Sequence, residues 1–308
     1  MIRVSYFGAY VEVFVARMGG NGYCRSFNGN GRMDIMVRDD VTGELLVFPH
    51  GGSFRGSETF GEPELISTGF HPLRNHGLVR PIDVNGNGYA DVIGISMSHM
   101  NDTHGIFLYP NKGGLNGLDT LGEPIRISGA RDDKKWETLG IADVDLDGCD
   151  DMFGREKDAG NVDAFFNQRE VKQNETYDRT AHRLVTVDVD DFPIGMADFT
   201  GTGRPDMLVR RANGDLDLYE FAHNTSGEGP WWQGEGRWFT LGRGWQEFEI
   251  ITLTDIDLDG RPDLLGVRGD GTLVVHLHNG KFDPDRPTAT LSTPEVIATG
   301  WQKYSVVS

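Results

Sequence analysis

The sequence predicts an all-β fold built from five similar units. The chain has 42 glycines in 308 residues, an abundance typical of short strands joined by tight turns. An acidic motif of ten residues recurs along the chain at a nearly constant interval, and apolar runs separated by turn residues follow each copy. These observations indicate a repeat architecture.

The motif is clearest in the stretch "DVDLDGCDDM", which begins at Asp143. Four related stretches begin at Ser26, Asp83, Asp198 and Asp255, so the chain contains five copies. We number them the first to fifth loops in chain order and count positions within each loop from its first residue. Position 9 is always aspartate, at intervals of 57, 60, 55 and 57 residues: Asp34, Asp91, Asp151, Asp206 and Asp263. One repeat is therefore about 57 residues long.

The sequence around each loop predicts four strands. An apolar run precedes the loop, as in "FEIITLTDID", and two further runs follow it as a hairpin. The hairpin turns "ANGD" and "RGDG" contain Asn-Gly and Asp-Gly pairs, which tolerate positive φ angles. A later run such as "PEVIATG" supplies the last strand. Each repeat is thus predicted to form a four-stranded antiparallel sheet.

Five such sheets would expose many strand edges in a flat stack, whereas a radial arrangement packs them face to face and keeps the edges short. The sequence therefore predicts a β-propeller, with five blades favoured over six or seven. The C-terminal "TGWQKYSVVS" matches the entry strand "RGWQEFEIIT" of the fifth repeat, while the first loop lacks an entry strand. We expect the C-terminal strand to close the first blade. Residues 21–308 form the propeller in this interpretation, and residues 1–20 form an N-terminal strand extension.

The loops have the composition of a calcium site. Calcium binds about six to eight oxygen atoms, which side chains at positions 1, 3, 5 and 9 and a carbonyl at position 7 can supply. Glycine at position 6 permits the sharp turn in every copy. An EF-hand is excluded because its position 12 requires glutamate, whereas Gly154 and Gly266 occupy that position here.

Charge count ranks the five loops, because more carboxylates give tighter calcium binding. We expect the third and fifth loops to fill first, then the second, while the first and fourth are weak or empty. The predicted ligands are Asp143, Asp145, Asp147 and Asp151; Asp255, Asp257, Asp259 and Asp263; Asp83, Asn85, Asn87 and Asp91; and Asp198 with Asp206.

Five tandem D-x-D/N-x-D/N-G-x-x-D loops on this β-rich period resemble the FG-GAP or VCBS repeats of integrin α-subunit propellers and many microbial proteins. The resemblance covers residues from about 20 to 308. It implies that the loops join the two inner strands of each blade on one face, where calcium makes them rigid. It also implies a secreted or cell-surface location, but no signal peptide is visible, which leaves the cytoplasm open.

The opposite face should contain the hairpin turns and the links between blades, where the repeats differ most. Aromatic rings beside cationic and imidazole donors suit sugars and other polar or anionic ligands. The candidate ligand-binding residues are His71, Arg74, His76, His99, His104, Trp136, Arg243, Trp245 and Trp301. Packing between blades is the competing interpretation of Trp245 and Trp301.

We predict a recognition module that binds a glycan or another polar ligand. The alternatives are an enzyme, such as a lyase, hydrolase or cyclase with one site near the propeller axis, and a scaffold for a protein partner. The net charge of −18 disfavours nucleic acid as a partner. No apolar run is long enough to insert into a membrane.

Overall fold

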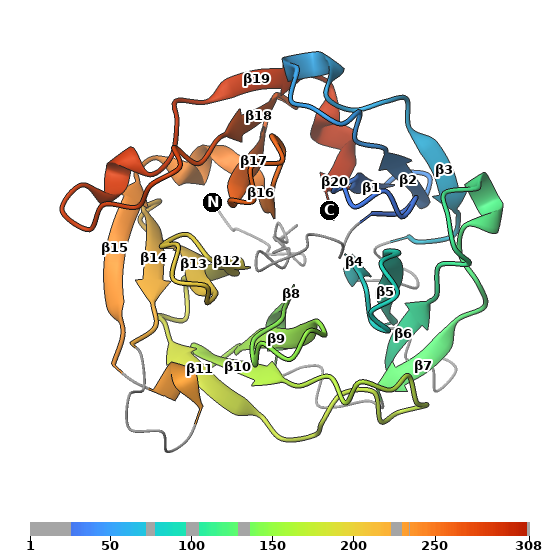
Figure 1. Cartoon of the computed structure of the whole chain (residues 1–308), viewed down its shortest axis with the longest axis horizontal. Helices are drawn as coiled ribbons and strands as arrows, with labels where there is room; N and C mark the ends of the chain where they lie inside the picture. The colour runs from blue at the N-terminus through green and yellow to red at the C-terminus, as the bar shows by residue number, and fades with distance from the viewer. Residues whose placement is uncertain are drawn as a thin grey trace, which may run out of the picture.

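The computed structural model is a ring of five four-stranded antiparallel sheets, arranged as the blades of a propeller (Figure 1). It describes residues 26–71, 78–96, 105–128, 136–222, 230–233 and 235–306. The prediction of an all-β, five-bladed fold is confirmed. The proposed extension at residues 1–20 lies outside the described residues.

In each blade, the strands are given from the centre of the ring to its rim. The first blade consists of β20 (Tyr304–Val306), β1 (Ile35–Asp39), β2 (Glu44–Phe48) and β3 (Glu64–Ser67). The second consists of β4 (Leu78–Ile82), β5 (Asp91–Ser96), β6 (Gly105–Tyr109) and β7 (Ile125–Ser128). The third consists of β8 (Trp136–Ala142), β9 (Asp151–Glu156), β10 (Asn161–Phe165) and β11 (His182–Thr186).

The fourth blade consists of β12 (Phe192–Ala197), β13 (Asp206–Arg210), β14 (Leu216–Glu220) and β15 (Arg237–Gly242). The fifth consists of β16 (Phe248–Thr254), β17 (Asp263–Arg268), β18 (Leu273–His276) and β19 (Glu295–Ala298). The ring closes in the first blade, where β20 pairs antiparallel with β1 in the register Val37↔Val306. The predicted closure by the C-terminal strand is confirmed.

The second strand of each blade lies between two neighbouring blades and is covered on both faces. All five residues of β1 are buried, as are the first five of β9 and of β17. This explains why apolar residues stand at consecutive positions in these segments, as in "IMV", "MF" and "LL", instead of at alternating ones. The core of the protein therefore lies between the blades.

Antiparallel order divides the connections between two faces. The five acidic loops and the connectors between third and fourth strands share one face, which we call the loop face. The hairpin turns and the links between blades share the other, the link face. There, one residue in each of four links donates its backbone N–H to a hairpin glycine carbonyl at 2.9 Å: Phe70 to Gly43, Val187 to Gly160, Trp245 to Gly214 and Trp301 to Gly271.

The fourth strand of a blade has one edge that pairs with no strand of its own sheet. The connector of the next blade covers this edge. The 3₁₀ helix η2 (Gly117–Asp119) packs beside β3, η1 (Gly56–Glu58) beside β19, and η6 (Pro287–Ala289) beside β15. In the third blade, Asn174 donates its backbone N–H to Arg126 O of β7 at 3.0 Å. Covered edges do not offer backbone groups to another chain.

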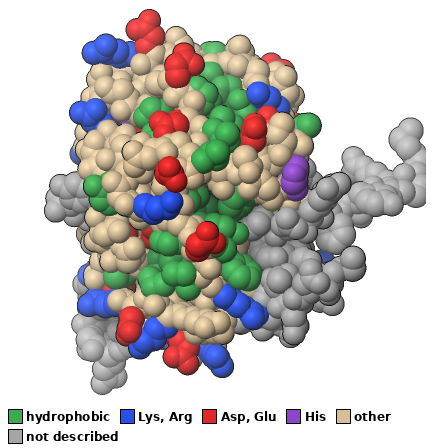
Figure 2. Space-filling model, turned by 90° about the vertical axis from the view of Figure 1, so that its right-hand side faces the viewer, with side chains coloured by type: hydrophobic (Ala, Val, Ile, Leu, Met, Phe, Trp, Pro, Cys, Tyr) green, Lys and Arg blue, Asp and Glu red, His purple; other side chains and the backbone are tan. Residues whose placement is uncertain are grey.

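Figure 2 views the rim on the side of β3 and β7, where hydrophobic side chains form a band between charged ones. On this side, Leu118 in η2 is 63% exposed and Ile125 in β7 is 38% exposed. Among the described residues, no helix is long and apolar enough to span a membrane.

Candidate functional site

The acidic loops share one hydrogen-bonded conformation, shown here for the fifth. The N–H of Asp259 donates to Asp255 Oδ1 at 2.9 Å and to Asp257 Oδ1 at 3.2 Å. The Gly260 N–H donates to Asp255 Oδ2 at 3.0 Å. Glycine at position 6 has a positive φ in every loop, from 74° at Gly31 to 100° at Gly148. The turn points the side chains at positions 1 and 3 toward the loop centre.

Two loops bring carboxylates together closely enough to bind one cation. Oxygens of Asp143, Asp145 and Asp151 lie within 4.8 Å of one another, and so do oxygens of Asp255, Asp257 and Asp263. These are the two loops that the sequence ranks first. Oxygen-only donor sets of this kind suit calcium.

The predicted ligands at position 5 lie outside these two clusters. Asp147 accepts the N–H of Cys149 and an Arg169 side-chain donor, whereas Asp259 accepts the N–H of Arg261. In the second loop, Asp83 accepts the N–H groups of Asn87 and Gly88. The second loop thus presents two carboxylates and two amides, as its sequence indicates.

The aspartate at position 9 joins the loop to the rest of its blade. Asp263 is 0% exposed; its Oδ2 accepts the Ile256 N–H at 2.9 Å and its Oδ1 accepts the His278 N–H at 2.7 Å. Burial raises the pKa of Asp263 to about 8, and the charges of Asp257 and Asp255 add to this effect. Burial likewise raises the pKa of Asp151 and of Asp206 to about 8.

The fourth loop differs in the hydrogen-bond donors to its position 9 aspartate, Asp206. Thr200 donates both its N–H and its hydroxyl to Asp206 Oδ2, at 2.9 and 3.0 Å. Asp198 at position 1 accepts the N–H groups of Thr202 and Gly203. Asp198 and Asp206 are the only carboxylic acids in this loop, in keeping with its low rank.

A second ring of contacts ties each loop to the next blade, and sequence reasoning missed it. The carbonyl at position 2 accepts a side-chain hydrogen bond from the following blade: Ile256 from His50, Phe27 from Asn111, Val84 from Asn167, Val144 from Trp231, and Phe199 from His278. These five bonds, at 2.9–3.2 Å, cross all five blade junctions.

Both histidines of this ring are held in one tautomer. The Gly52 N–H donates to His50 Nδ1 at 2.9 Å, and the Gly280 N–H donates to His278 Nδ1 at 3.0 Å. Each Nε2 must then be the protonated nitrogen that donates to the neighbouring carbonyl. The available sequence signal is a His or Asn just after the third strand in "VFPHGG", "LYPNKG", "FFNQRE" and "HLHNGK".

The predicted ligand-binding residues do not form one site among the described residues. Trp245 and Trp301 are only 5% and 7% exposed, and they pack against Phe248 and Phe48 respectively. Arg243 lies on the link face with its side chain 84% exposed, 3.8 Å from Asp215. His71 packs beside Gly43 of the first hairpin.

Several predicted ligand-binding residues cannot be placed. Arg74, His76, His99 and His104 lie outside the described residues. Trp136 begins β8, but its side chain is also outside them.

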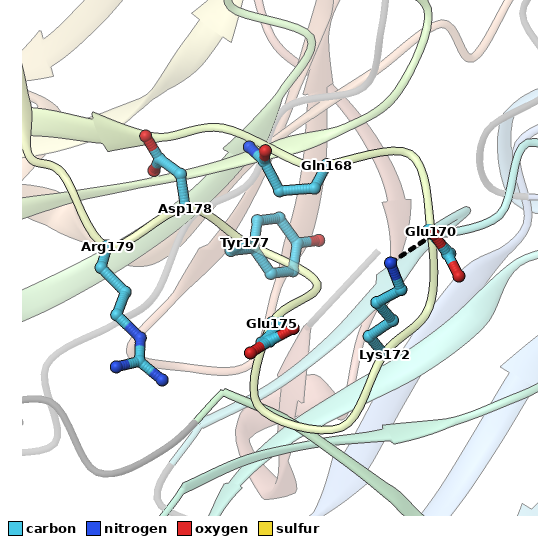
Figure 3. A pocket seen from close by; sticks show the side chains of 7 residues that line it. All are labelled: Gln168, Glu170, Lys172, Glu175, Tyr177, Asp178 and Arg179. Carbon is cyan, nitrogen blue, oxygen red and sulfur yellow. Dashed lines mark ion pairs between the residues drawn. The ribbon is translucent and has the colours of Figure 1, made fainter.

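A basin of about 320 Å³ lies in the connector of the third blade, on the loop face (Figure 3). Tyr177 lies in its middle, with Asp178 and Arg179 on one side and the paired Glu170 and Lys172 on the other. Tyr177 is 4% exposed, and its hydroxyl donates to Asp150 O at 3.4 Å. The basin is polar, carries both signs of charge, and was not predicted from the sequence.

No protein-family model and no curated protein matches the chain. Among solved structures, it is similar to an Agrocybe aegerita lectin described as recognising non-reducing terminal N-acetylglucosamine. The two are 20% identical; the match covers 92% of this chain and 68% of the lectin, with a TM-score of 0.47.

The chain is also similar to Saccharomyces cerevisiae Prp20p, a protein described with its binding to Gsp1p and histones. The identity is 14%, the coverage is 84% of this chain and 60% of Prp20p, and the TM-score is 0.30. A TcdB2-TccC3 structure matches 85% of this chain and 13% of its own, at 13% identity and a TM-score of 0.32. These identities are too low to transfer a function. The resemblance to FG-GAP or VCBS repeats therefore rests on the loop motif and the blade architecture.

Proposed function

We propose that this chain is a calcium-stabilised β-propeller that works as a recognition module, binding a glycan or another polar ligand on the link face. The observation that carries the calcium part is the pair of carboxylate clusters in the third and fifth loops. Burial raises the pKa of Asp151 and Asp263 to about 8, so their ionised forms need compensation at neutral pH. Bound calcium would supply that compensating charge.

Calcium would act on the structure of the ring. Asp263 joins the fifth loop to its own blade through the His278 N–H, and Ile256 O joins it to the first blade through His50. A cation between the carboxylates would hold both connections in place. The fifth loop joins the fifth blade to the first, the blade that the C-terminal strand completes, so its occupancy should matter most for closure.

The described part of the link face supports recognition because hydrogen bonds hold its backbone and polar side chains cover it. Four links donate hydrogen bonds to hairpin glycines, and a surface whose backbone is held in this way loses little conformational entropy when a ligand binds. Exposed charged side chains stand on this framework, including Arg243, Lys303 and Glu247. Arg243 presents a largely exposed guanidinium suited to carboxylate or hydroxyl groups.

An enzyme with one site near the propeller axis would use histidines such as His71, His76, His99 or His104 as catalytic groups. Only His71 belongs to the described residues, and it packs beside the first hairpin. No contact in the described part of the chain favours catalysis over recognition, so recognition is the function proposed.

A binding screen with two matched variants tests the recognition part. The protein is applied to a glycan array with calcium present, and the affinity for each bound glycan is then measured with R243A and R286A. Both arginines are exposed, but Arg286 lies in a connector of the loop face. Loss of a charge-assisted hydrogen bond of about 1.5–3 kcal/mol should weaken binding about tenfold or more in R243A only.

Absence of any saturable glycan binding would reject the glycan as ligand. Equal affinities for R243A, R286A and the wild type would place the ligand away from Arg243 and contradict the assignment to this part of the link face.

A further inference from the structure

The connector of the third blade carries an arginine where the matching blades carry glycine. The position is defined by a shared hydrogen bond, in which a backbone N–H donates to the side chain two residues earlier. The pairs are Gly52 with His50, Gly113 with Asn111, Gly280 with His278, and Arg169 with Asn167. All four residues have a left-handed backbone, with φ of 100°, 103°, 79° and 61° respectively. Glycine adopts this conformation freely, whereas arginine does not.

A reciprocal exchange at loop position 7 accompanies this arginine. In the first blade, a Cβ on Gly52 would lie 2.6 Å from Arg32 Nη1, so a side chain there would collide with the position 7 arginine. In the fifth blade, the corresponding distance from Gly280 to Arg261 Nε is 3.8 Å. The third loop has Cys149 at position 7, and Arg169 enters from the connector instead.

The position of the arginine, in the connector or in the loop, changes its contacts with the loop. Arg169 Nε donates to Asp147 Oδ2 at 2.5 Å, and its Nη2 donates to the main-chain oxygen of Asp147 at 2.8 Å. In the fifth loop, Arg261 Nε lies 3.8 Å from Asp259 Oδ2. The third loop is therefore bonded to its arginine twice, and the fifth only loosely.

We propose that Arg169 is a built-in counter-cation of the third loop, which sets the calcium affinity of this loop below that of the fifth. The inference rests on the proposed calcium function of the two loops. A guanidinium bonded to Asp147 repels a divalent cation nearby and competes with the ion for this carboxylate. The number of carboxylates at the four ligand positions does not distinguish the two loops, because both carry aspartate at positions 1, 3, 5 and 9.

The effect is moderate because the arginine is solvated. Its side chain is 60% exposed, so water screens its charge. Removal of the guanidinium should tighten calcium binding by about fivefold.

Calorimetric titration of calcium into metal-free protein tests this, with each loop isolated by one substitution. D257N weakens the fifth loop and reports the third, whereas D145N weakens the third and reports the fifth. R169G adopts the residue of the three other connectors, and R169N keeps a neutral side chain that tolerates the left-handed backbone. Thermal melting in chelator verifies that each variant is folded.

In the D257N background, R169G and R169N should each tighten binding by about fivefold, whereas in the D145N background neither should change it. The double variant C149R/R169G, which copies the fifth blade, should give an intermediate affinity. Unchanged or weaker binding for R169G and R169N in the D257N background would overturn the proposal. If neither background binds calcium, the proposed function itself fails, and the role of Arg169 is rejected with it.

Discussion

The first and fifth loops have the same hydrogen-bonded turn but different chemistry. In the first, the Asn30 N–H donates to Ser26 Oγ at 2.9 Å and to Asn28 Oδ1 at 3.1 Å. In the fifth, the corresponding N–H of Asp259 donates to two aspartates at 2.9 and 3.2 Å. Neutral side chains therefore satisfy the same donors. The turn does not require negative charge, so the extra aspartates of the fifth loop are not explained by the turn, in agreement with the proposed calcium site.

The same two loops differ in how strongly their surroundings raise the pKa of the aspartate at position 9. Burial raises the pKa of Asp34 to about 6, and the charge of Arg32 works against this rise. Burial raises the pKa of Asp263 to about 8, and neighbouring aspartates push it in the same direction. Without a cation, the fifth loop thus disfavours the ionised form of its position 9 aspartate more than the first loop does.

An exchange of the side chains at positions 1, 3 and 5 between the first and fifth loops should have the largest effect on the calcium dependence of stability. D255S/D257N/D259N gives the fifth loop the neutral residues of the first. With free calcium about 100-fold above the dissociation constant, loss of one site should lower the free energy of unfolding by about 2.7 kcal/mol. In chelator the variant should equal or exceed the wild type, because like charges are removed. Denaturant unfolding with and without calcium measures both values.

The reverse exchange is the matched control. S26D/N28D/N30D should make the first loop respond to calcium. If neither exchange changes the calcium dependence of unfolding, the aspartates do not serve a cation.

Removal of a hydrogen bond between blades should have the next largest effect on the free energy of unfolding. H278A removes the donor to Phe199 O and the acceptor of the Gly280 N–H, which should cost about 1–3 kcal/mol of unfolding free energy. H278N should cost much less, since Asn111 donates to Phe27 O and accepts the Gly113 N–H in the same way. Denaturant unfolding of H278A and H278N measures both losses of stability. Equal losses in the two variants would show that these hydrogen bonds do not stabilise the junction.

The smallest effect concerns pH. Burial lowers the pKa of His50 and of His278, so the folded protein binds fewer protons there than the unfolded chain. Their contribution to stability is complete above the unfolded pKa of about 6.5 and decreases as the pH falls below it, by at most about 1.4 kcal/mol per pH unit for each histidine. H50N/H278N should flatten the difference in unfolding free energy between pH 7 and pH 5. Identical pH profiles for variant and wild type would refute this role.

The period of the acidic loop was enough to predict the blades and their number, and the match of "TGWQKYSVVS" to "RGWQEFEIIT" predicted the closure of the first blade by the C-terminal strand. Charge count ranked the third and fifth loops first for calcium, and these are the loops whose carboxylates come together; the order in which calcium fills the loops stays a prediction. These features depend on local spacing, which a repeat displays directly.

Other features depend on contacts between distant residues. His50 and Ile256 are 206 positions apart, and no local pattern pairs them. Trp245 and Trp301 were named as ligand candidates because aromatic rings suit both sugar binding and packing, and only the fold shows that they are buried. The bond between Arg169 and Asp147 likewise joins two segments 22 residues apart.

Direct titration of calcium into metal-free protein, followed by calorimetry, tests the central claim most directly. We expect at least two saturable sites, one lost in D145N and the other in D257N, with any site in the second loop weaker than these. Absence of saturable binding at millimolar calcium, or binding that neither substitution alters, would contradict the assignment of the third and fifth loops as calcium sites.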